Sequence, residues 1–219
     1  MSWYADKVFP YLMEWVMGKE EFRRQRHEAL ADVYGTVLEI GLGTGLNLPH
    51  YPARVTWFTG IDLRVQLPKT LEARSIGLSF PVEIFKLDAE RLPFETARFD
   101  CVVSTWTLCS IPNVLAALTE VRRVLKPGGS FLFLEHGLSE DPKIARWQNR
   151  LTPVQKVVAC GCHLNRRIDE LVRSAGFSIE LLERYQMESL PKIGGSMYRG
   201  RAVPLTAEQR QPFKAASGL

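Results

Sequence analysis

The stretch that decides the fold is LEIGLGTGLN, residues 38 to 47. A short apolar run leads into three glycines separated by single residues, Gly41, Gly43 and Gly45, and Glu39 stands just before them. Glycine removes the side chain where the backbone passes close to a ligand. In an open α/β sheet, ligands bind beyond the carboxyl ends of the strands, often at the first strand-to-helix turn. The stretch therefore predicts a ligand site on a parallel sheet.

Strands and helices alternate around that turn. Five short segments rich in β-branched and aromatic residues are predicted strands: 36–40, 55–62, 82–88, 99–105 and 130–136. The clearest helix between them spans 113–125 and is closed by KPGG. A helical insertion over 140–175 precedes two late strands, 177–185 and 196–203, expected to form an antiparallel hairpin. The pattern predicts an α/β, Rossmann-like doubly wound sheet of seven strands, mostly parallel with an antiparallel last strand.

Residues 1–30 differ from the rest because they mix aromatic and charged side chains at roughly helical spacing. We expect one or two amphipathic helices, broken near Pro10, that form a lid or cap over the site. A helix lying on a membrane surface is the alternative, which Glu14 and its acidic neighbours weaken. Arg23, Arg24 and Arg26 are interpreted as a solvated helix face. The domain itself is predicted over 31–204, followed by a polar tail over 205–219.

Composition restricts the class of protein. The chain has 219 residues, 46% hydrophobic, with 28 basic against 24 acidic side chains, which suits one soluble domain without a nucleic-acid partner. No apolar run reaches the ~20 residues of a membrane span, and no signal peptide is visible. Four cysteines do not make a disulfide scaffold, and Cys101 is expected in the core. A cytoplasmic protein is predicted, with membrane-surface contact and oligomeric state left open.

The glycine pattern discriminates between ligands. A dinucleotide fingerprint needs its third glycine at position 46, which is Leu46, so the motif reads E-x-G-x-G-x-G. Asp62 ends the second predicted strand, where a carboxylate can accept both ribose hydroxyls. Asp88, followed by Ala89, ends the third and can read an adenine ring. Acidic groups around the turn exclude a phosphate site and suit a ligand that carries a sulfonium and an ammonium.

Residues 34–136 resemble class I S-adenosylmethionine-dependent methyltransferases of the methyltransferase-11 type, through VLEIGLGTG, GID, DAERLPFETARFDCVVS and VRRVLKPGG. The resemblance implies a methyl-transferring enzyme that uses S-adenosyl-L-methionine and releases S-adenosyl-L-homocysteine. The residues expected to bind this cofactor are Glu39, Gly41, Gly43, Gly45, Asn47, Asp62, Leu63, Asp88, Ala89 and Thr105.

A closer resemblance, over about 34–203, is to small methyltransferase-like enzymes that methylate alkyl thiols in animals. It rests on HYP, TLCSI, LEHG, GCHLNR and GRAV. It implies a small apolar acceptor, with a thiol favoured. A phospholipid amine, a quinone precursor or another small molecule methylated on nitrogen or oxygen is the alternative. A nucleic-acid methyltransferase is disfavoured because an N/D-P-P-Y/F motif is absent, and intact glycines and acids argue against a non-catalytic scaffold.

Several residues are candidates for the acceptor side of the site. His136, at the end of the fifth predicted strand, is the best-placed general base, or else a histidine that only hydrogen-bonds its surroundings. Trp106, Cys109 and Trp147 are expected to line the substrate pocket, with Trp15 as a further apolar wall. The C-x-C-H motif at 160–163 offers at most three cramped ligands and no second cysteine pair, so no metal is expected.

Overall fold

The computed structural model spans residues 1–219 and describes all of them except 1–2, 65–66, 207–208 and 210–219. Seven strands form one sheet: β1 (Gly35–Ile40), β2 (Val55–Asp62), β3 (Val82–Lys86), β4 (Phe99–Thr105), β5 (Leu125–His136), β6 (Phe177–Gln186) and β7 (Ser196–Pro204). The helices are α1 (Trp3–Lys7), α2 (Phe9–Met17), α3 (Glu20–Leu30), the short 3-10 helix η1 (Leu48–His50), α4 (Pro68–Ser75), α5 (Val114–Val124), α6 (Pro142–Val158) and α7 (Ile168–Ser174).

The strand order is β3-β2-β1-β4-β5-β7-β6. The first five strands pair in parallel, whereas β7 runs antiparallel to both β5 and β6. This confirms the predicted doubly wound sheet and its late antiparallel hairpin. The strand order reverses between β1 and β4, so the ligand crevice of such a sheet lies beside the end of β1.

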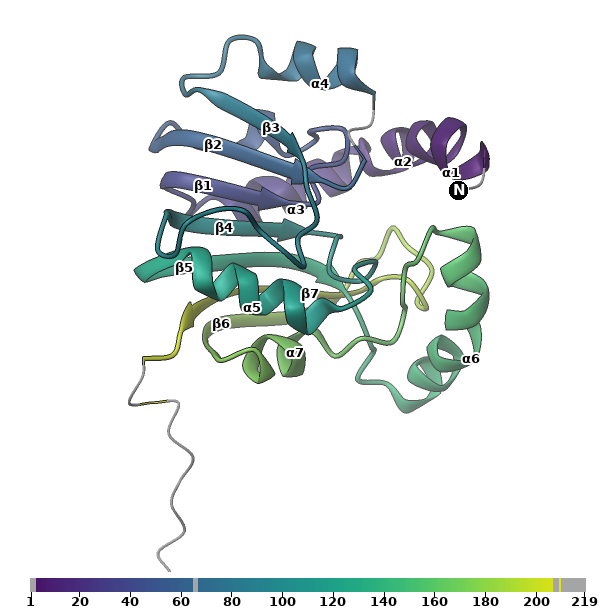
Figure 1. Ribbon diagram of the computed structural model, residues 1–219. Helices are drawn as coiled ribbons and strands as arrows, with labels where there is room; N and C mark the ends of the chain where they lie inside the picture. The colour runs from purple at the N-terminus through teal and green to yellow at the C-terminus, as the bar shows by residue number, and fades with distance from the viewer. Residues whose placement is uncertain (1–2, 65–66, 207–208, 210–219) are drawn as a thin grey trace, which may run out of the picture.

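Two apolar layers cover the sheet. On one face, α5 and α7 pack over Phe131, Phe133 and their neighbours. On the other, α3 contributes Leu30 to a cluster around Val37 and Phe58. Figure 1 shows α5 and α7 in front of the sheet, α3 behind it, and α1, α2 and α6 on the side toward which the parallel strands point. The helices beside the carboxyl ends of the parallel strands are therefore α1, α2 and α6, none of which connects two consecutive parallel strands.

The element boundaries depart from the sequence prediction in several places. The N-terminal segment forms three helices, because the chain breaks once before Pro10 and again at Gly18. The insertion over 140–175 is two helices separated by a loop over 159–167. β3 ends at Lys86, so Asp88 lies two residues beyond the strand. Most of the predicted tail falls outside the described residues, and no helix in the described part of the chain is long and apolar enough to cross a bilayer.

Candidate active site

The three glycines of the turn after β1 differ in how closely other atoms surround them. A Cβ at Gly41 would lie 2.1 Å from the Thr107 hydroxyl, and one at Gly45 would lie 2.5 Å from Leu71. A side chain at either position would clash with these neighbours, and Gly41 also lines the cavity described below. At Gly43, with φ +57, a Cβ would meet no atom within 4 Å. Gly43 is thus the position where backbone opens onto space for a ligand.

Asp62, at the end of β2, is tied to that turn. One of its carboxylate oxygens accepts the Gly43 N–H at 2.9 Å, and the other accepts the Arg64 N–H at the same distance. Burial raises the pKa of Asp62, although both backbone donors oppose the shift. Each oxygen keeps a second lone-pair direction, so the carboxylate can still accept hydrogen bonds from a pair of hydroxyl groups.

Glu39 is fully buried at the centre of the site. Its carboxylate accepts hydrogen bonds from the Asn47 amide at 2.9 Å and the Tyr51 hydroxyl at 2.8 Å. Burial raises the pKa of Glu39 to about 8 even though both donors lower it. The Asn47 amide also reaches Thr105 Oγ1 at 2.9 Å, while its buried Oδ1 has no partner in the described structure. An acidic group and an open acceptor oxygen together suit an ammonium ion.

Arg26 of α3 is a site residue that the sequence analysis placed wrongly. The arginine cluster was interpreted as a solvated face, yet Arg26 is 3% exposed. Its guanidinium donates to the Met17 carbonyl at 2.7 Å and lies 4.8 Å from the centre of the Trp106 ring. Its charge also opposes the rise in the pKa of Glu39. The sequence could not distinguish Arg26 from Arg23 and Arg24, because only the rotation of the helix about its axis decides which arginine points inward.

A cavity of about 130 Å³ lies between these residues and the N-terminal helices. Its walls come from α2, α3, the glycine turn and the loop after β4; they are Met13, Glu14, Met17, Arg26, Glu39, Gly41, Leu42, Gly43, Thr44, Leu46, Asn47, Thr105, Trp106 and Thr107. Glu14 fixes α2 to the turn, since it accepts from the Thr44 hydroxyl at 2.5 Å and from the Arg74 guanidinium at 3.1 Å. The first helices therefore cover the end of the site nearest Glu39.

Five predicted cofactor residues lie outside that cavity: Gly45, Asp62, Leu63, Asp88 and Ala89. Leu63 follows β2 and is 53% exposed, so its apolar side chain is available to contact the planar adenine ring of a bound cofactor. Asp88 is exposed and accepts the Glu90 N–H at 2.9 Å, whereas Ala89 is buried. Leu63 follows β2, and Asp88 and Ala89 follow β3, so all three lie on the β1 side of the point where the strand order reverses. They extend the site from the ammonium end toward β3.

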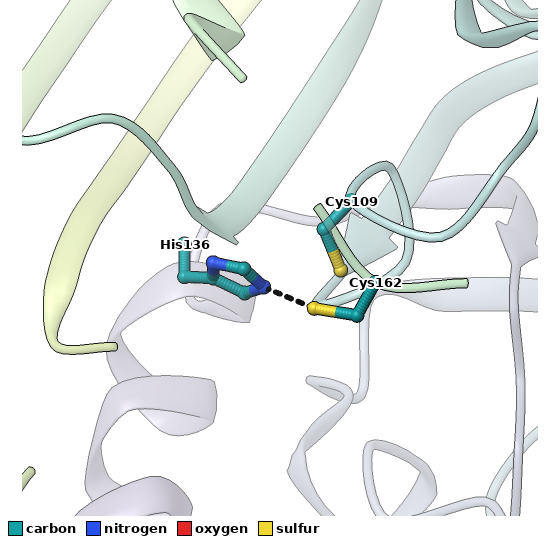
Figure 2. A group of neighbouring side chains, drawn as sticks. All are labelled: Cys109, His136 and Cys162. Atoms are coloured by element: carbon teal, nitrogen blue, oxygen red, sulfur yellow. Dashed lines mark hydrogen bonds between the residues drawn. The ribbon is translucent and has the colours of Figure 1, made fainter. Parts of the chain in front are cut away.

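A second group of side chains lies at the ends of β4 and β5 and in the loop after α6, where Cys109 and His136 were predicted to serve the acceptor. His136, Cys109 and Cys162 come from these three segments, and Figure 2 shows their side chains turned toward one another. His136 Nε2 lies 3.0 Å from the Cys162 sulfur, and its buried Nδ1 has no partner in the described structure. The hydrogen bond with Cys109 and burial both raise the pKa of the Cys162 thiol, so it stays protonated at neutral pH.

Of the expected pocket residues, Trp106 lines the cavity, whereas Cys109, Trp147 and Trp15 do not. Trp147 is 55% exposed on α6 and Trp15 is 67% exposed on α2, so neither forms a wall of the cavity. Periodicity could not separate them from Trp106, which does line it. Cys160 is exposed, and only Cys162 of the C-x-C-H motif joins the buried group. Cys101 lies in the core of β4, as expected.

Glu135 was missed by the sequence analysis, although it stands in the quoted LEHG. It is completely buried, and one of its oxygens accepts from the Ser104 hydroxyl at 2.7 Å and from the N–H groups of Thr107 and Leu108, each at 3.1 Å. It therefore fixes the loop after β4, which carries both Trp106 and Cys109. An acidic residue inside an otherwise apolar strand is the signal that could have found it.

The fold is a doubly wound α/β sheet with a crevice at its switch point, where Glu39, Asn47 and Asp62 offer acceptors suited to an ammonium group and to ribose hydroxyls. The open space at Gly43, the unpartnered Asn47 oxygen and the Asp62 carboxylate fit S-adenosylmethionine.

Comparison with known proteins agrees with this assignment. The family model described as a methyltransferase domain matches residues 38–133. Thiol S-methyltransferase TMT1B of Rattus norvegicus is 32% identical over 189 residues, covering 80% of this chain and 77% of the relative. Phosphatidylethanolamine N-methyltransferase of Cereibacter sphaeroides is 33% identical over 127 residues, covering 57% of this chain and 59% of the relative.

A solved structure of phosphoethanolamine N-methyltransferase 2 from Haemonchus contortus with S-adenosylhomocysteine superimposes with a TM-score of 0.65. It is 17% identical and covers 90% of this chain and 57% of that one, so the likeness concerns the fold. The chain belongs to the S-adenosylmethionine-dependent methyltransferases, and S-adenosylmethionine is its cofactor.

Proposed function

We propose that this enzyme transfers the methyl group of S-adenosylmethionine to the thiol of a small apolar molecule. The observation that carries the proposal is the extent of the similarity to the rat thiol S-methyltransferase. It covers 189 aligned residues, far more than the cofactor-binding half over 38–133. The segments outside that half include the end of β5 and the loop after α6, where the acceptor side of the site is proposed to lie.

The cofactor, when bound, supplies a methyl group already activated on a sulfonium. The protein then has to hold and align the reactants and to exclude water, since the leaving thioether is neutral. In the proposed arrangement, Glu39 and Asn47 hold the ammonium of the cofactor, and Asp62 holds its ribose. The helix α2 covers that end of the crevice and acts as a lid, with Glu14 as its attachment to the turn.

An acceptor thiol must lose its proton before it attacks, because the thiolate is the nucleophile. His136 can take that proton if its Nε2–H donates to the Cys162 sulfur, which leaves the lone pair of Nδ1 available. The short Nε2 to Cys162 contact and the unpartnered Nδ1 both fit this tautomer. Cys162 would then orient the ring, and Trp106 would provide an apolar wall for the acceptor.

A phospholipid amine or a quinone precursor is the second candidate acceptor. The identity with the Cereibacter sphaeroides enzyme favours it, although this chain spans less than two thirds of that relative's length. Such an acceptor would need no general base of the same strength if the amine arrived uncharged. A cytoplasmic location, the lack of a nucleic-acid partner and a membrane-surface contact stay predictions.

The test is a panel of thiols, amines and phenols assayed for S-adenosylhomocysteine release by wild type and by His136→Ala. The variant should lose more turnover on alkyl thiols of high pKa than on acidic aromatic thiols, which ionise unaided. His27→Ala, on the exposed side of α3, is the matched control and should behave as wild type. An equal loss across the thiol series would leave His136 with only a shaping role, and methylation of amines alone would refute the thiol acceptor.

A further inference from the structure

Cys109, His136 and Cys162 form one buried group, and the proposed methyl transfer gives a chemical role only to His136 and Cys162. They are 3%, 9% and 8% exposed, and their two sulfurs and one imidazole nitrogen all lie within 4.8 Å of one another. In the sequence they are separated by more than twenty residues at each step, so only the fold assembles them. Their side chains converge from three different segments on one point (Figure 2).

Each of these segments is held by bonds that do not involve the group itself. The carbonyl of Cys109 accepts the His163 N–H at 2.9 Å, and the Arg166 guanidinium donates to the Leu108 and Ile111 carbonyls. The loop after α6 is thereby joined to the loop after β4 on both sides of Cys109. His136 is fixed as the last residue of β5, paired with Met197 of β7. The three donor atoms are therefore pre-positioned by the backbone.

Two thiols and an imidazole are the donor set that a borderline-soft divalent cation prefers. Zinc bonds of ~2.3 Å to sulfur and ~2.0 Å to nitrogen place donors about 3.6–3.8 Å apart in a tetrahedron. The observed separations, at most 4.8 Å, need only a shift of about an ångström in the side chains. With both cysteines as thiolates, the loaded site would also carry no net charge, which suits its burial.

The geometry points to a metal site in this protein: Cys109, His136 and Cys162 bind one thiophilic divalent cation of the zinc type. No fourth histidine, cysteine or acidic side chain of the described residues joins the set, so one coordination position is left for an exogenous ligand. Three protein ligands with an open fourth position is the arrangement of reactive zinc sites. This inference does not depend on which acceptor is methylated.

The experiment uses the whole protein, stripped of metal with a chelator and kept reduced, and titrated with Zn²⁺ against a chromophoric chelator. Wild type should bind about one equivalent. Loss of an outer hydrogen bond already weakens metal sites ~10–100-fold, so Cys109→Ser and Cys162→Ser should each weaken binding by more than about 100-fold. Cys160→Ser is the matched control, since it alters an exposed thiol two positions from Cys162, and its affinity should equal that of wild type.

A second measurement needs no variant. Zn²⁺ should protect Cys109 and Cys162 from alkylation, mapped by mass spectrometry, and should leave Cys160 as reactive as before. Failure of wild type to compete for Zn²⁺, absence of this selective protection, or an equal loss of binding in Cys160→Ser would each overturn the site. A cation on Nε2 also places the ring proton on Nδ1, so zinc should suppress any methylation that uses His136 as base. The Zn²⁺ titration tests the metal site, and the acceptor panel tests the methyl acceptor, so either proposal can be refuted while the other stands.

Discussion

Glu39 should release a proton when the cofactor binds. Burial raises the pKa of its carboxyl to about 8, so at pH 7 roughly nine in ten molecules of the free enzyme carry a proton there. An ammonium ion placed beside Glu39 favours the carboxylate and returns its pKa toward the ordinary value of ~4.3. Binding at pH 7 should then release about 0.9 proton per molecule.

The release of a proton on binding determines how the affinity for the cofactor depends on pH. Because the free enzyme holds a proton that the complex lacks, affinity should rise as pH increases. The gain should be about tenfold per pH unit between pH 6 and 7.5, and it should level off above pH 8.

The same raised pKa means that the folded protein binds more protons than the unfolded chain between about pH 4.5 and 8. The contribution of Glu39 to stability is therefore lost as pH rises through that window.

Calorimetry with S-adenosylhomocysteine measures this directly, because the product keeps the ammonium group and does not turn over. Titrations at pH 7 in buffers of low and high ionisation enthalpy give the number of protons released. Glu39→Gln should bring that number near zero. Glu120→Gln, on α5 and paired with Arg123, is the matched control and should leave it unchanged. Undiminished proton release by Glu39→Gln, or no release by wild type, would refute the reasoning.

Four further variants test the geometry of the turn and of the helix attached to it. Asp62→Ala should weaken S-adenosylhomocysteine binding by ~1–3 kcal/mol in calorimetry, and equal affinity would remove Asp62 from the site. Gly41→Ala, whose Cβ would meet Thr107 at 2.1 Å, should destabilise the fold by at least ~2 kcal/mol in thermal unfolding. Gly43→Ala should unfold closer to wild type yet bind the product poorly, and the reverse order would contradict the assigned roles. Glu14→Gln should speed product dissociation about 2–10-fold in stopped flow if α2 is a lid, whereas an unchanged rate would make α2 a fixed wall.

The sequence was informative wherever function is written in short, local patterns. The glycine turn, the acid at the end of β2 and the βα rhythm lie in contiguous segments, so the fold class and the cofactor could be predicted from them. Boundaries were less certain because caps and breaks depend on single residues. Asn113, whose side chain accepts from the Ala116 N–H, starts α5, and Pro68 begins α4.

The role of individual glycines could not be predicted from the motif. An added Cβ would meet Thr107 at Gly41 and Leu71 at Gly45, residues from other parts of the chain, but no atom within 4 Å at Gly43. The spacing of the three glycines is the same whichever of them meets a ligand. Which contact each position makes is set by the packing of other elements around the turn, and that packing has no local signature.

By itself, the sequence determined the doubly wound sheet, the methyltransferase family and the cofactor, because each depends on residues close together along the chain. Only the tertiary structure decided that Arg26 points inward while Trp147 faces out, since a helix phase shifted by one residue reverses such an assignment. It also decided that Cys162 belongs with Cys109 and His136 rather than with its neighbour Cys160. Cys109 and His136 are close because β4 and β5 are parallel neighbours that end at one edge of the sheet, and hydrogen bonds between the loops after α6 and after β4 bring Cys162 to the same place.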